Sequence, residues 1–107
     1  MALYLYQAAY TPESLTAQMK DPQDRLSVVS GQLASVGASI VGGGFCFGEF
    51  DLAALIEAPD DRTMAAIAVS IAAAGAVRNA KTTPLIPGAE YIEVLKKAGT
   101  VGYRAAR

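Results

Sequence analysis

Two apolar segments, 38–47 and 52–58, are separated by one short connection, Gly48-Glu49-Phe50-Asp51. The first segment contains the β-branched pair Ile40 and Val41, which favours an extended strand. Parallel neighbours need a crossover of a dozen or more residues, whereas a connection of this length suits a β-hairpin. The two segments are therefore predicted to be antiparallel strands, and this pairing limits the folds that the chain can adopt.

The residues before the hairpin predict a strand and then helix. From Leu3 to Tyr10, leucines alternate with tyrosines, so that one face of the strand carries Leu3 and Leu5 and the other carries tyrosines. Thr11-Pro12-Glu13 and Asp21-Pro22 each resemble a helix start, with an N-cap followed by proline. We expect the main helix to begin at the second of these and to end at Gly37. Its apolar stripe consists of Leu26, Val29, Leu33 and Val36.

The residues after the hairpin predict a helix, a strand and a last helix. Pro59-Asp60-Asp61 predicts a helix with an acidic first turn, and Gly75 is placed to end it. The segment 76–86 then predicts a fourth strand. A last helix is expected over Gly88 to Ala98, where Glu93 and Lys97 have the spacing of a favourable ion pair.

The order strand, helix, strand, strand, helix, strand predicts an α+β, ferredoxin-like βαββαβ fold with a C-terminal helix. Its four-stranded antiparallel sheet is expected to run in the order 4-1-3-2. Two helices cover only one face of such a sheet, so the face that bears either the tyrosines or the leucines of the first strand needs another cover. A second copy of the chain is the expected cover.

The stretch Gly48-Glu49-Phe50-Asp51, with the helix start Ala58-Pro59-Asp60-Asp61 that follows, resembles the signature of the GYD family. That family is named for Gly-Tyr-Asp, and Phe50 stands where its tyrosine usually lies. The resemblance implies one GYD-like domain over residues 1–107, with a ferredoxin-like core at 1–86 and a C-terminal helix and tail at 87–107. It also implies a dimeric α+β barrel, in which two sheets close over a cavity.

The composition of the chain argues against some classes of binding partner and favours another copy of the chain. Nine basic and ten acidic residues give a net charge of −1, which offers no electrostatic footprint for nucleic acid. Hydrophobic residues make up 52% and charged residues 18%, and we expect some of the apolar excess at a subunit interface. Segment 64–74 is too short to span a membrane. A single cysteine and no positively charged leader predict a cytoplasmic protein.

Cofactors and metals are not expected. The chain contains no histidine, which argues against imidazole-ligated metal or haem. Glu49 and Asp51 lie two residues apart and could share a proton or hold a hard cation, although Asp51 is also a standard turn residue. Cys46 lacks a base to activate it, so a packing role is expected. The glycines at 42–44 lack the lysine and following helix of a phosphate loop, and predict a strand irregularity instead.

Tyr4, Tyr6 and Arg78 form the favoured ligand-binding group. The predicted strand order places the fourth strand beside the first, where an arginine near two phenols could orient an anionic or aromatic ligand. The alternative is a subunit interface that satisfies the hydroxyl groups. If leucines line the barrel, Gln7 becomes its polar group.

Three classes of function follow from these observations. The first is a homo-oligomeric binding or accessory module for a small apolar or aromatic molecule. The second, by analogy with the barrel group, is a cofactor-free enzyme of the monooxygenase or isomerase kind, and the third is a structural oligomerisation unit. An enzyme needs a titratable group suited to neutral pH, and few are present, so we place binding first.

Overall fold

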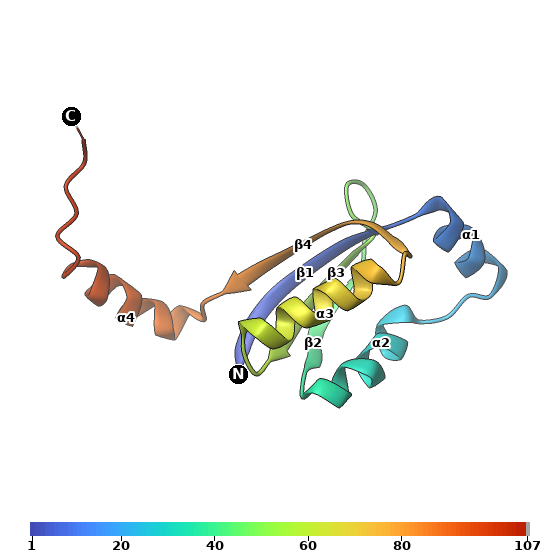
Figure 1. Cartoon of the computed structure of the whole chain (residues 1–107), viewed down its shortest axis with the longest axis horizontal. Helices are drawn as coiled ribbons and strands as arrows, with labels where there is room; N and C mark the ends of the chain where they lie inside the picture. Colours follow the sequence, from blue (N-terminus) through green and yellow to red (C-terminus); the bar gives the residue numbers. More distant parts are fainter. Residues whose placement is uncertain (107) are drawn as a thin grey trace.

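The computed structural model describes residues 1–106, which fold into a four-stranded sheet with helices, as Figure 1 shows. The strands are β1 (Ala2–Tyr10), β2 (Ser39–Phe45), β3 (Leu52–Ala58) and β4 (Val77–Leu85). The helices are α1 (Pro12–Lys20), α2 (Arg25–Leu33), α3 (Asp61–Ala73) and α4 (Gly88–Ala98), and a short 3₁₀ turn, Ala34–Val36, follows α2. This element order confirms the predicted α+β, βαββαβ-like fold with a C-terminal helix.

The sheet runs in the order β2-β3-β1-β4, and every neighbouring pair is antiparallel. This is the predicted 4-1-3-2 order read from the other edge. In the centre of the sheet, Leu5 pairs with Leu55 of β3 and with Thr83 of β4. The hairpin β2–β3 and the central position of β1 are therefore as the sequence predicts.

The two faces of the sheet differ in what covers them. Helices α2 and α3 pack on one face (Figure 1), where Tyr4, Tyr6 and Ile56 are almost wholly buried. On the opposite face, Leu3 and Leu5 remain partly exposed. The sequence left the direction of the tyrosines open, and the structure directs them into the core beneath the helices.

Aspartates cap two of the helices, α3 at its predicted start and α2 three residues after its predicted start. The Asp60 carboxylate accepts a hydrogen bond from the Thr63 backbone N–H at 2.9 Å, and α3 begins at the next residue. Helix α2 begins later than the Asp21-Pro22 signal predicts, because the Asp24 carboxylate caps it by accepting a bond from Leu26 N at 3.1 Å. Both carboxylates are bonded in their charged form, which lowers the pKa of each.

Strand β2 is shorter than predicted and irregular. It ends at Phe45, and Phe47, which was expected to lie in the strand, is 98% exposed. The pairing with β3 shifts register between Ile40 and Gly42, which confirms the expected irregularity. Gly43 has φ of 121°, a backbone conformation that other residues rarely adopt.

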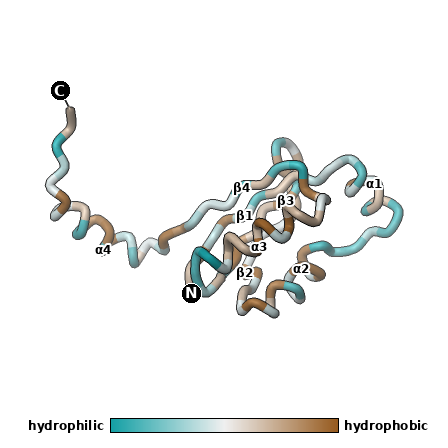
Figure 2. Tube along the Cα trace, viewed as in Figure 1, coloured by the Kyte–Doolittle hydropathy of each residue, from teal (hydrophilic) through white to brown (hydrophobic). Residues whose placement is uncertain are grey.

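The C-terminal helix α4 projects away from the sheet (Figure 1) and buries none of its residues. Figure 2 shows that apolar positions recur along it, among them Ile92 and Leu95, each more than half exposed. The expected pair between Glu93 and Lys97 does not form, because Glu93 instead bonds Lys96 at 3.3 Å, one position nearer. The final residue of the basic tail, Arg107, lies outside the described residues. Within residues 1–106, no helix is long and apolar enough to cross a membrane.

Candidate functional site

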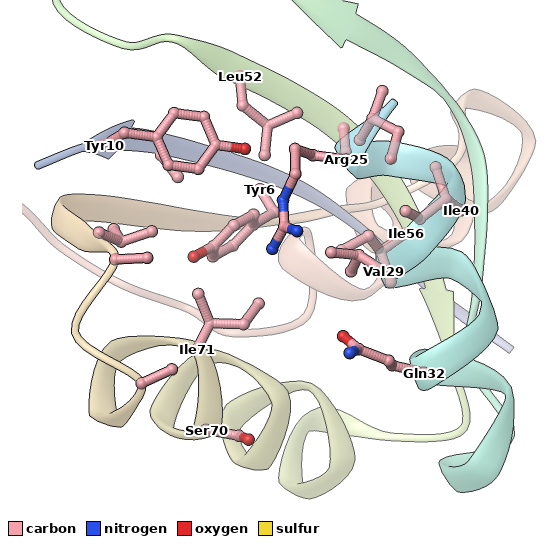
Figure 3. Close-up of a pocket in the computed structure, with 16 residues that line it drawn as sticks. Tyr6, Tyr10, Arg25, Val29, Gln32, Ile40, Leu52, Ile56, Ser70 and Ile71 are labelled. Atoms are coloured by element: carbon pink, nitrogen blue, oxygen red, sulfur yellow. The ribbon is translucent and has the colours of Figure 1, made fainter. Parts of the chain in front are cut away.

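A pocket of about 410 Å³ lies between the sheet and the helices α2 and α3. Its walls are mostly apolar (Figure 3) and include Val29 from α2, Ile40, Leu52 and Ile56 from the sheet, and Ile71 from α3. Ligand pockets are typically concave and apolar, with volumes of roughly 300–1,000 Å³ and a few convergent polar groups. This pocket lies on the helix-covered face of the sheet, away from the open face.

Polar side chains reach the pocket from three elements. Tyr6 and Tyr10 come from β1, Arg25 and Gln32 from α2, and Ser70 from α3. In Figure 3 the guanidinium of Arg25 extends over the pocket beside the ring of Tyr6. The arrangement brings two phenols and one cation around an otherwise apolar space.

The hydroxyl group of Tyr6 is buried and has no hydrogen-bond partner within residues 1–106. Tyr6 as a whole is only 3% exposed. Leaving a buried polar group unpaired costs about 1–3 kcal/mol, so such groups usually have a partner. An unpaired phenol in the wall of a pocket therefore indicates a hydrogen-bond partner inside the pocket, either a ligand or an ordered water molecule.

Both pocket phenols are held in their protonated form. Burial is the main cause of the raised pKa of Tyr6, and the neighbouring Tyr10 adds to it. Burial likewise raises the pKa of Tyr10, although the positive charge of Arg25 opposes the change. At neutral pH both hydroxyl groups can donate hydrogen bonds, and neither is suited to act as a base.

Tyr4, from the predicted ligand-binding group, has a different role. Its hydroxyl donates a 2.5 Å hydrogen bond to Oδ1 of Asp61, in the first turn of α3. This bond, with burial as a further cause, raises the pKa of Tyr4 to about 12. Tyr4 does not line the pocket, and its side chain instead attaches α3 to the sheet.

The Tyr4 bond predicts a specific sensitivity to alkali. The pKa of Tyr4 in the folded protein lies above the ordinary value of 10.0. The stabilisation of the fold by its hydrogen bond to Asp61 is therefore complete below pH 10 and is lost as pH rises towards about 12. The thermal midpoint of wild type should therefore fall more steeply over this range than that of Tyr4→Phe. Tyr6 and Tyr10 titrate in both proteins, so they cancel in the comparison. Parallel midpoint curves would contradict the bond.

Asp51 forms hydrogen bonds between the hairpin connection and the end of β1. Its Oδ2 accepts a hydrogen bond from the Tyr10 backbone N–H at 2.9 Å, and its own N–H donates to the carbonyl of Ala8 at 2.8 Å. Its carbonyl also accepts from Cys46 N at 2.8 Å. These bonds give Asp51 a structural function, and the residue does not line the pocket.

Asp51→Ala should lower the free energy of unfolding by about 1–3 kcal/mol, because the Tyr10 amide loses its partner. Asp51→Asn keeps an oxygen acceptor and should lose less. Chemical denaturation measures both, and ligand binding in the pocket should be unchanged in each. An unchanged unfolding free energy together with lost binding would instead place Asp51 in a ligand site.

The other predicted site residues lie apart from the pocket. The expectation that Cys46 is a buried packing residue is wrong, because Cys46 is exposed and its Sγ donates to the carbonyl oxygen of Phe50 at 3.2 Å. Glu49 is exposed and Phe50 is partly buried. Arg78 is exposed and is the extra residue where the register of β1 and β4 shifts, so the structure does not bring it to Tyr6. No cluster of three potential metal ligands occurs within residues 1–106.

Two pocket residues, Tyr10 and Arg25, were not among the predicted site residues. The alternation along the first strand does predict Tyr10 on the same face as Tyr6, but Tyr10 was not included in the predicted ligand-binding group. Arg25, Val29 and Gln32 are spaced by four and three residues and so share one side of α2. Arg25 thus supplies the cation that was expected from Arg78.

Comparison with protein families adds an independent finding. The GYD domain model matches residues 4–95, which include the pocket, the hairpin connection and most of α4. The chain belongs to the GYD domain family. No curated protein and no solved structure matches the chain. In this GYD domain, Phe50 lies in the hairpin connection and is not among the residues that line the pocket.

Proposed function

We propose that this GYD domain is a homo-oligomeric module that binds a small apolar or aromatic molecule in the pocket beneath α2 and α3. The observation that carries this proposal is the buried, unpaired hydroxyl of Tyr6 in an apolar wall. A ligand that accepts a hydrogen bond there would remove the cost of burying that group. The apolar lining would supply most of the binding energy.

The proposal of a homo-oligomer rests on two further apolar surfaces. The open face of the sheet carries Leu3, Leu5 and Leu55, all partly exposed. The second surface is α4, whose exposed Ile92 and Leu95 have no partner in the core. Apolar surfaces of this kind mark interaction sites, and a second copy of the chain would cover the sheet face as in a dimeric α+β barrel.

Binding is favoured over the alternative of a cofactor-free enzyme. An enzyme at neutral pH needs an acid or base with a pKa near 7. The pKa of Tyr6 and that of Tyr10 are both raised, which makes them hydrogen-bond donors. No carboxylate or thiol is among the pocket residues.

The binding proposal is tested by filling the pocket. Val29→Trp places a large ring in the pocket and should weaken binding of the neutral fluorescent probe N-phenyl-1-naphthylamine at least tenfold. Val28→Trp is the matched control, because Val28 is on the same helix but does not line the pocket. Fluorescence titration measures both affinities, and circular dichroism checks the fold. Equal affinities in the two folded variants would overturn the proposal.

A further inference from the structure

We propose that the ligand of this pocket is an apolar or aromatic monocarboxylic acid, whose carboxylate is bound by the guanidinium of Arg25 and the phenol of Tyr6. This inference rests on the proposed binding function and names the class of its ligand. The starting point is charge: Arg25 is the one charged side chain among the pocket residues, and no Asp or Glu lines the pocket. The pocket therefore presents a single positive charge.

Arg25 is not neutralised by the protein. It forms no salt bridge within 4.0 Å in residues 1–106, where the one ion pair joins Lys96 and Glu93. The adjacent carboxylate, Asp24, is occupied by the N–H groups of Leu26 and Ser27 and by the Ser27 hydroxyl. Arg25 is partly buried, so an anion beside it would be less screened than at an open surface.

The position of Arg25 does not stabilise helix α2. It is the first residue of α2, where the helix dipole disfavours a cation. Its spacing from Val29 places it on the side of α2 that faces the pocket. A cation that costs helix stability and extends over an apolar pocket (Figure 3) is accounted for by an anion bound there.

The set of donors matches a carboxylate. A guanidinium offers a planar fork of N–H groups that suits a carboxylate geometrically, and the Tyr6 hydroxyl has an unused proton to donate. A doubly charged phosphate would need more cationic groups than this pocket holds. The surrounding walls, including Ile56 and Ile71, suit the apolar body of the molecule.

The test compares two probes with the same naphthalene ring, the anion 2-naphthoate and the neutral amide 2-naphthamide, by isothermal titration calorimetry. Wild type should bind 2-naphthoate at least tenfold more tightly than 2-naphthamide. Arg25→Gln should weaken 2-naphthoate binding about 30- to 100-fold and leave 2-naphthamide unchanged. Tyr6→Phe should weaken 2-naphthoate about five- to twentyfold. Arg62→Gln is the control, because Arg62 is an exposed arginine at the start of α3, outside the pocket.

The outcomes separate this inference from the binding proposal. If both naphthyl probes bind wild type equally, or if Arg25→Gln and Arg62→Gln bind 2-naphthoate alike, the carboxylate inference is wrong although the pocket binds ligands. If neither these probes nor N-phenyl-1-naphthylamine bind wild type, both proposals fall. Thermal midpoints of the variants confirm that the folded proteins are being compared.

Discussion

Gly43→Ala is expected to destabilise the protein by roughly 2–5 kcal/mol, from strain of the backbone and forced movement of the sheet. Gly43 has φ of 121°, which a residue with a Cβ adopts only at a cost. A Cβ built there would lie 2.3 Å from the carbonyl oxygen of Ala53 and 2.7 Å from the Cα of Ala54. Both contacts are with the backbone of β3, which cannot rotate away as a side chain would.

Gly44→Ala is the matched control, one residue further along the same strand. A Cβ at Gly44 meets no atom within 4 Å, and its φ is not in the left-handed region. Its unfolding free energy should stay within about 1 kcal/mol of wild type. Urea denaturation of both variants measures the difference. If Gly43→Ala and Gly44→Ala are equally stable, the close approach of β2 and β3 at Gly43 does not occur.

Leu55→Glu is expected to dissociate the proposed homo-oligomer. Leu55 lies in the middle of the open sheet face, paired with Leu5 of β1. Leu55 is already partly buried in the single chain, so only part of the roughly 1.5–3 kcal/mol of a leucine's burial belongs to the proposed interface. A twofold interface would contain this residue twice, and each glutamate would also have to be buried or paired. We therefore expect association at least about a hundredfold weaker, which corresponds to roughly 3 kcal/mol.

Val69→Glu is the matched control for Leu55→Glu, because it adds the same charge outside the proposed oligomer interface. Val69 is 67% exposed on α3, and α3 covers the face of the sheet opposite to the open face (Figure 1). Sedimentation of this variant should match wild type at every concentration, while Leu55→Glu should approach the 11.1 kDa of one chain. If the wild-type protein sediments as a single chain at micromolar concentration, the proposal of a homo-oligomer is refuted.

The fold could be predicted because its signals are local. The short connection at 48–51 sets an antiparallel hairpin, and the alternation in β1 marks a strand. The helix starts were found where side-chain caps lie, at Thr11 and Asp60. Helix α2 was misplaced by a few residues because two aspartates, Asp21 and Asp24, compete for the cap, and only Asp24 uses its carboxylate to bond the backbone of α2.

The pocket could not be predicted because it depends on how distant elements dock. Spacing along α2 indicates that Arg25 and Val29 share one side, but not that this side lies over Tyr6. Arg78 was predicted to lie near Tyr6, but it does not. The register shift between β1 and β4 makes Arg78 the extra residue of a β-bulge. A one-residue shift of that kind is not visible in the sequence.

The most direct test of binding in the pocket is the location of bound N-phenyl-1-naphthylamine, mapped by changes in the NMR chemical shifts of side-chain methyl and aromatic groups. Side chains alternate between the two faces of the sheet along β1, so neighbouring residues of one strand report on opposite sides. We expect the largest changes around the pocket, at Tyr6, Val29 and Ile71, and we expect them to diminish in Val29→Trp. Changes centred on Leu3, Leu5 and Leu55 of the open face, with the pocket residues unaffected, would contradict binding in the pocket.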